Sequence, residues 1–178
     1  TKYGTFDNAV KTALAEADEV FARCDEFDAR FTAQMKEINE DFANIGALAY
    51  RQAFAAHKLC QSKDGEVLFM SKECFSNGCM PTLAVTYPSI PLFLLYAPRL
   101  VEGMLEPVFT MVDKGLWEYE FAPHDVGRYP LANGQVYGYL ERYLKIKPDP
   151  LQWQMPVEEC GNMIVLCAAY LLGVLDNV

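Results

Sequence analysis

The sequence predicts a mainly α-helical protein built from helical hairpins, and three observations support this prediction. Apolar residues repeat at intervals of three and four through most of the N-terminal third of the chain, which is the period of one buried helix face. A second such stripe runs from Leu100 to Val112, and a nearly continuous apolar run occupies Met163–Leu175. Strand signals are short by comparison, so helices should form most of the structure.

The composition is typical of a folded globular protein. The 178 residues include 24 acidic and 15 basic side chains, which gives a formal net charge of −9, and 52% of the residues are apolar. The negative charge argues against nucleic-acid binding, because contacts to phosphates need a surplus of lysine and arginine. It argues equally against binding to an anionic membrane surface. The run Met163–Leu175 is shorter than the roughly 20 residues that span a bilayer, so no membrane insertion is expected.

We interpret residues 1–178 as a single domain that is a fragment of a longer multidomain protein. The helix predicted over Met163–Leu175 is apolar on every face, and such a helix must be buried against other segments. Only three residues follow this run, so other parts of a longer polypeptide are expected to cover it.

The N-terminal part predicts two or three helices packed as antiparallel hairpins. Helical spacing of apolar residues continues from Phe6 to Ile45, but one unbroken helix would be about 60 Å long at 1.5 Å per residue. We expect breaks near 24–28, where Asp25 or Asp28 could cap a helix, and near 44–46. The apolar stripe then continues to residue 60, which places His57 on the surface of a helix.

Turn residues and prolines change the pattern in the middle of the chain. A turn at 62–65 precedes a short β element near 66–70. Prolines leave room for only a short helix at Leu92–Tyr96, whereas Pro98 suits the first turn of the next helix. Pro107 should kink or split that helix. A long irregular segment is expected near 115–156, and a segment of this kind is usually functional.

The cysteines and histidines predict no metal or cofactor site. Six cysteines are present, but none lies in a C-x-x-C or a Cys/His spacing typical of zinc sites. The adjacent His124 and Asp125 supply only two ligands. Cys74 and Cys79 flank a turn and could pair with each other, and the other cysteines are expected to be mostly buried thiols.

Three polar clusters lie where loops meet regular elements, at 72–78, 123–130 and 155–163. In such places a rigid element can aim a side chain while the loop admits substrate. Two carboxylates on opposite sides of a cleft can divide general acid and general base catalysis. The candidate catalytic residues are Glu73, Asp125, Glu158 and Glu159. The candidate substrate-binding residues are Asn77, His124, Arg128, Tyr129 and Asn162.

Each candidate also has a structural alternative. A carboxylate can cap a helix or form an ion pair, and His124 beside Asp125 is either a proton-transfer pair or a hydrogen-bonded link between loops. Glu158 and Glu159 would point about 100° apart on a helix, so at most one of them faces a given pocket.

Four stretches, in this order, resemble the glutaminase A family. They are Lys-Glu-x-x-Ser-Asn-Gly at 72–78, Tyr-Pro-Ser-x-Pro at 87–91, Ala-Pro-His-Asp-x-Gly-x-Tyr-Pro at 122–130 and Met-Pro-x-Glu-Glu-x-Gly-Asn-Met at 155–163. The resemblance runs from Tyr50 to Met163, and the last stretch is the most specific. Proteins of this family contain a central domain of unknown function, the DUF4965 type, normally followed by a six-hairpin-like domain, DUF1793.

The resemblance implies a fold and a function. It implies helical hairpins that form part of an (α/α)6 toroid of the six-hairpin glycosidase type. It also implies a fragment of an exported, glutaminase-like amidohydrolase that cleaves the side-chain amide of L-glutamine to glutamate and ammonia. The expected partners are a small-molecule substrate, either an amino acid or a sugar, and flanking domains of the parent chain. The isolated chain is expected to be inactive.

Two alternatives to the glutaminase hypothesis remain open at this point. One is a six-hairpin glycoside hydrolase that uses a carboxylate pair, and the other is a structural part of the toroid without chemistry of its own. The family resemblance further implies a periplasmic or extracellular location, with the export signal outside residues 1–178. An oxidising compartment of this kind would favour a disulfide between Cys74 and Cys79.

Overall fold

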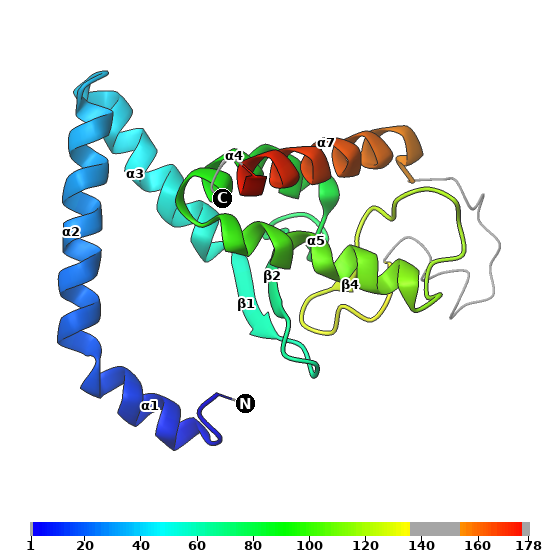
Figure 1. The fold of residues 1–178 in the computed structure, drawn as a ribbon, viewed down its shortest axis with the longest axis horizontal. Helices are drawn as coiled ribbons and strands as arrows, with labels where there is room; N and C mark the ends of the chain where they lie inside the picture. The colour runs from blue at the N-terminus through cyan, green and yellow to red at the C-terminus, as the bar shows by residue number, and fades with distance from the viewer. Residues whose placement is uncertain (1, 136–153, 176–178) are drawn as a thin grey trace. The chain divides into compact units, whose positions relative to one another are not determined.

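The computed structural model describes residues 2–135 and 154–175, and helices dominate it (Figure 1), which confirms the predicted fold class. The chain divides into two compact units, Thr1–Phe54 and Ala55–Val178. No helix among the described residues combines the length and the apolarity that a bilayer crossing requires.

Unit 1 contains α1 (Phe6–Ala15), α2 (Ala17–Lys36) and most of α3 (Glu40–Ala55). The last two form the predicted antiparallel hairpin, since Phe27 and Phe31 of α2 pack against Tyr50 of α3 with ring centroids 5.0 and 5.4 Å apart. Asp28 and Arg51 add an ion pair of 2.7 Å across the hairpin. Because both of its side chains are well exposed, the aromatic packing contributes more to stability than this pair does.

Both predicted helix breaks in unit 1 are wrong. The helix α2 runs without interruption through residues 24–28, and α3 runs without interruption through residues 44–46. The breaks fall instead at Glu16 and between Lys36 and Glu40. The reversal between α2 and α3 occurs just before Asn39, whose side-chain oxygen accepts a hydrogen bond of 2.7 Å from the backbone N–H of Phe42. This side chain satisfies one of the free N–H groups at the start of a helix. Asn39, and not an aspartate near residue 25, therefore caps the start of the second helix of the hairpin.

Unit 2 begins with an antiparallel hairpin of β1 (His57–Gln61) and β2 (Val67–Ser71). The predicted β element near 66–70 is thus confirmed, but the placement of His57 on a helix surface is wrong. His57 starts β1, is only 7% exposed, and stacks on Phe69 with centroids 4.5 Å apart. The reason is non-local. Pairing with β2 provides hydrogen-bond partners for the backbone of β1 and buries His57 against Phe69. These interactions outweigh the helical spacing of the local sequence.

Three helices pack around the core of unit 2: α4 (Leu83–Tyr96), α5 (Pro98–Asp113) and α7 (Pro156–Leu175). Figure 1 shows α4 and α7 side by side, with α5 next to them. Fully buried side chains from all three helices meet there, among them Phe93, Met104 and Leu166.

The prolines have less effect on the helices than predicted. The helix α4 is longer than the short segment expected at Leu92–Tyr96, although Pro88 and Pro91 lie inside it. Each proline removes one backbone hydrogen bond, and we attribute the tolerance to the burial of side chains such as Ile90 and Phe93. Pro98 occupies the start of α5, as predicted, and α5 continues past Pro107 without splitting.

The described part of the expected irregular segment contains one short strand. This strand, β4 (Gly127–Arg128), pairs antiparallel with β3 (Cys79–Met80). Apart from β4, residues 114–135 form turns and extended chain, as predicted, and residues 136–153 of the predicted segment lie outside the described residues.

The close approach of α5 to β2 depends on a glycine. A Cβ atom at Gly103 would lie 2.8 Å from the carbonyl oxygen of Val67 and 3.1 Å from the amide nitrogen of Phe69. Both neighbours are backbone atoms, so neither can yield by rotating a side chain. The packing of helix on hairpin therefore requires glycine at this position.

We predict that Gly103→Ala lowers the free energy of unfolding by about 1–3 kcal/mol, the usual cost of overpacking. The matched control is Gly161→Ala in α7, where an added Cβ meets no atom within 4 Å. That variant should be more stable by about 0.5–1 kcal/mol, because alanine is the better helix former. Urea denaturation measures both, and equal stabilities of the two variants would contradict the close packing at Gly103.

Candidate functional site

The pairing of β3 with β4 brings the first two polar clusters together. Cys79 lies opposite Arg128 and Met80 lies opposite Gly127. The backbone N–H of Val126 donates to the carbonyl of Met80 at 2.7 Å, which continues the contact beyond the short ladder. This pairing places residues 124–126 beside residues 80–83, and the side-chain ligand atoms of Cys79 and Asp125 come within 4.8 Å of each other.

Gly127 makes this geometry possible. Its backbone φ of +134° is one that residues with a side chain rarely adopt. A Cβ atom at this position would also lie 2.6 Å from the backbone nitrogen of Asn133. The chain can therefore turn directly after Asp125 only with glycine at this position.

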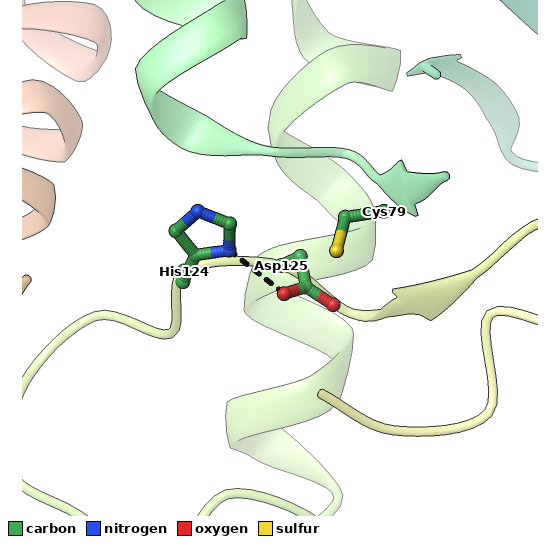
Figure 2. Close-up of side chains that lie close together, drawn as sticks. All are labelled: Cys79, His124 and Asp125. Atoms are coloured by element: carbon green, nitrogen blue, oxygen red, sulfur yellow. Dashed lines mark hydrogen bonds and ion pairs between the residues drawn. The ribbon is translucent and has the colours of Figure 1, made fainter. Parts of the chain in front are cut away.

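Asp125 is the centre of a buried polar network and has no exposed surface. Its Oδ2 accepts a hydrogen bond of 2.8 Å from His124 Nδ1, and its Oδ1 accepts one of 2.8 Å from the backbone N–H of Gly127. The thiol of Cys79 points at the same carboxylate, as Figure 2 shows. Several donors thus converge on one carboxylate, which compensates for its removal from water.

The pKa of His124 reflects this network. Burial by itself lowers the pKa of the imidazole, but the hydrogen bond to Asp125 and the charges of Asp125, Glu159 and Glu73 outweigh it and raise the pKa above the ordinary 6.5. The imidazole is 5% exposed. The pair can therefore hold a proton near neutral pH in a site that is largely shielded from water.

Glu159 brings the third cluster to the same place. Its side chain is completely buried, and its Oε2 accepts a hydrogen bond of 3.0 Å from Nδ2 of Asn162, one turn later on α7. Its Oε1 has no well-formed hydrogen bond with any residue that the structure describes. Burial raises the pKa of this carboxyl, although Asn162, the charge of His124 and the backbone N–H of Ala84 oppose the shift. A buried carboxyl with a raised pKa is suited to proton transfer.

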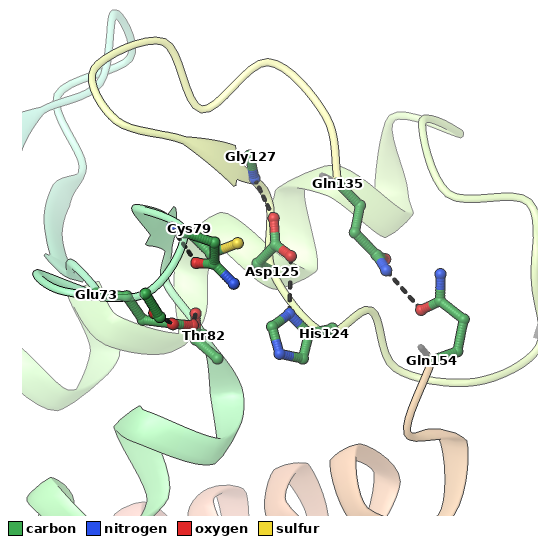
Figure 3. Close-up of polar contacts among 10 residues, drawn as sticks. Glu73, Cys79, Thr82, His124, Asp125, Gly127, Gln135 and Gln154 are labelled. Carbon is green, nitrogen blue, oxygen red and sulfur yellow. Dashed lines mark hydrogen bonds and ion pairs between the residues drawn. The ribbon is translucent and has the colours of Figure 1, made fainter. Parts of the chain in front are cut away.

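Glu73 lies near this network but is held by its own loop. Its carboxylate accepts hydrogen bonds from the hydroxyl groups of Ser76 and Thr82, the second at 2.6 Å. Figure 3 shows the contact between Glu73 and Thr82 beside Cys79. Asn77 holds the same loop, since its Oδ1 accepts a hydrogen bond of 2.9 Å from the backbone N–H of Cys79. Among the described contacts, Glu73 and Asn77 shape the loop that carries Cys79.

The remaining candidates lie on the surface. Glu158 is exposed, whereas the adjacent Glu159 is buried, so the two carboxylates do face different surroundings. Arg128 is also exposed, and Tyr129 is 44% exposed with the ammonium group of Lys72 4.5 Å from its ring centroid. The structure thus brings together His124, Asp125, Glu159 and Asn162, with Glu73 nearby. The catalytic and binding roles of all nine candidates remain predictions.

Sequence reasoning missed the place of Cys79 in this cluster. One ligand-type atom from each of Cys79, His124 and Asp125 lies within 4.8 Å of the others, and all three residues are buried. The disulfide considered between Cys74 and Cys79 is absent, because both are free thiols; Cys74 is exposed and Cys79 is buried. The sequence spacing gives no signal for this, since the β3–β4 pairing joins residues nearly fifty positions apart.

We predict that Asp125→Asn lowers the pKa of His124, because the hydrogen bond and charge that oppose the effect of burial are lost. The chain has only two histidines, so a pH titration of the imidazole NMR signals, with a chelator present, resolves both. The exposed Asp113→Asn variant is the control and should leave the pKa unchanged. An unchanged His124 pKa in Asp125→Asn would contradict the proposed coupling.

The raised pKa of His124 also determines whether the stability of the fold rises or falls with pH. A raised pKa means that the folded state binds the proton more tightly than the unfolded chain does. The stabilisation is therefore complete below pH 6.5, the ordinary value, and is lost as the pH rises through the raised pKa of His124. Denaturation of the wild type should show this loss, and Asp125→Asn should show less of it.

Comparisons with known proteins identify the family. Residues 39–174 match the family described as the glutaminase A six helical-hairpin domain. The chain is 36% identical over 139 residues to glutaminase A of Aspergillus oryzae, which covers 78% of this chain and 18% of that protein. It is 34% identical over 128 residues to a probable glutaminase of Arthroderma benhamiae, which covers 71% of this chain and 13% of that protein. No solved structure matches the chain.

The chain therefore spans less than a fifth of the length of these two relatives. The family match includes every residue of the buried cluster and agrees with the helical hairpins described above. On this evidence the chain belongs to the glutaminase A family.

Proposed function

We propose that this chain is part of a glutaminase-like hydrolase that cleaves the side-chain amide of L-glutamine to glutamate and ammonia. Family membership and the names of the two relatives support this reaction. The structural observation that carries the proposal is the buried Glu159 carboxyl, whose raised pKa and interaction with His124 suit it to proton transfer. The reaction belongs to the whole polypeptide, of which this chain supplies one part of the site.

The chemistry requires a proton to move twice. Water attacks the carbonyl carbon of the amide and gives a proton to a base; the C–N bond then breaks, and the nitrogen takes up a proton as it leaves as ammonia. Glu159 is our candidate for the group that accepts and returns this proton. The hydrogen bond that Asn162 donates orients the Glu159 carboxylate, and the hydrogen bond that His124 Nδ1 donates to Asp125 fixes the ring of His124.

The other candidates have supporting roles in this proposal. The exposed guanidinium of Arg128 could bind the α-carboxylate of an amino-acid substrate in a bidentate manner, with Tyr129 beside it. Glu73 and Asn77 hold the loop of Cys79 in place. Glu158, which is exposed, is the less suitable of the two adjacent carboxylates for a dry catalytic site. Export of the parent protein and contact with its flanking domains, both implied by the family resemblance, belong to the same proposal.

A comparison of two adjacent variants tests the catalytic assignment. In the whole polypeptide that carries this chain, Glu159→Gln should lower kcat for ammonia release from L-glutamine by about 10²–10⁴-fold, the usual contribution of general acid–base catalysis. Glu158→Gln removes the same charge one residue earlier and should keep nearly full activity. Equal activity of the two variants would overturn the role of Glu159.

A glycoside hydrolase is the second candidate, because three aromatic side chains cluster on the segment before His124. Trp117 and Tyr119 contact each other with centroids 5.0 Å apart, and Tyr119 stacks with Phe121 at 5.3 Å. Aromatic rings of this kind can bind the faces of sugars. Assays of the whole polypeptide on glycosides and on glutamine distinguish the two reactions, and inactivity on both would favour a purely structural role for this domain.

A further inference from the structure

We propose that Cys79, His124 and Asp125 bind a divalent transition-metal ion, for which zinc is the best match. One ligand atom from each residue lies within 4.8 Å of the other two, and all three side chains are buried. Figure 2 shows the Cys79 sulfur and the His124 ring on opposite sides of the Asp125 carboxylate. The sequence spacing alone offered only two adjacent ligands, and the third comes from the other strand of the β3–β4 pair.

The donor set selects the class of metal. A sulfur, an imidazole nitrogen and a carboxylate oxygen together suit zinc, which accepts all three atom types, whereas calcium and magnesium prefer oxygen ligands. Zinc binds these atoms at about 2.0–2.3 Å, which places neighbouring ligand atoms roughly 3–4 Å apart. The three ligand atoms lie within 4.8 Å of one another, and His124 Nδ1 is 2.8 Å from Asp125 Oδ2. These separations need to change by only about 1 Å to reach that geometry.

The protons of the cluster occupy the place that a metal ion would take. Without metal, the His124 N–H and the Cys79 S–H both point at Asp125. A cation among the three groups would displace these protons, since a coordinated thiol is deprotonated. Metal binding would therefore release the shared protons.

The charge around the cluster also favours a cation. Three carboxylates, those of Asp125, Glu159 and Glu73, act on the single imidazole of His124. The positive charge of Arg128 acts on Cys79, but this side chain is exposed. Negative charge therefore exceeds positive charge in a buried site, where an uncompensated carboxylate is costly, and a divalent ion would balance it.

Glu159 is a further buried acidic group whose charge acts on His124. Its fully buried Oε1 has no well-formed hydrogen bond with any described residue, although a buried carboxylate oxygen normally has a donor. Three protein ligands and one open position are the arrangement of catalytic zinc sites, in which the metal lowers the pKa of its bound water. If the proposed function holds, an ion held by Cys79, His124 and Asp125 would activate water for attack on the amide. Glu159, whose carboxyl interacts with the charge of His124, would accept the proton of that water.

Metal binding by the full 178-residue chain is the direct test. The protein is stripped with a chelator, dialysed and titrated with Co²⁺, which reports a bound thiolate by a sulfur-to-cobalt charge-transfer band. The wild type should show the band at one equivalent, and Cys79→Ser should lose it. Cys74→Ser, which removes an exposed thiol from the same loop, should keep it. A wild type without the band, or a Cys79→Ser protein that retains it, would overturn the proposal.

A second variant guards against misfolding of Cys79→Ser. Asp125→Asn keeps the thiol and nearly the same shape, and it should weaken zinc affinity by more than about tenfold, the loss that even an outer partner of a zinc ligand can cause. Zinc should raise Tm in the wild type and in Cys74→Ser more than in Asp125→Asn, and equal increases would contradict the site. These readouts do not involve glutamine: zinc binding without glutaminase activity would refute only the proposed function, and activity without zinc binding would refute only this site.

Discussion

The pairing of two very short strands is the constraint on which the candidate site depends. Without the β3–β4 ladder, Cys79 and the His124–Asp125 pair would belong to separate loops. The ladder contains only two residues on each side, so its stability comes from the bonds that extend it, such as that from Val126 to Met80. Glycine at position 127 allows the turn that completes it.

The packing of the helices determines how far this site is buried from solvent. The first turn of α4 starts beside His124, since the backbone N–H of Leu83 donates to the His124 carbonyl at 3.1 Å. The helix α7 packs on α4 and brings Glu159 into the same buried region. Charges in such a region interact strongly, because little water screens them. The packing that buries Leu83 and Leu166 therefore also shifts the pKa values of His124 and Glu159.

Helix type and the grouping of polar residues could be predicted from the sequence, but the spatial partners could not. The helical spacing correctly predicted most helices, and the motifs at 123–130 and 155–163 led directly to His124, Asp125 and Glu159. His57 was misplaced because a non-local strand pairing, which no local pattern records, outweighs helical spacing. Cys79 was missed as a member of the cluster for the same reason. The start of α3 depends on a cap by the Asn39 side chain, whereas the break at Glu16 involves no side-chain cap. The aspartates near 25 mark neither position.

The separation of the site residues along the chain has a consequence for folding. Cys79 and Arg128 are strand partners across nearly fifty residues, and closing a loop of that length is entropically unfavourable before other contacts form. The segment between them includes the two helices α4 and α5, which contact each other and can form locally. Once these helices have paired, the remaining loop is effectively much shorter. We therefore expect the polar cluster to form late in folding, after the helices of the core have packed.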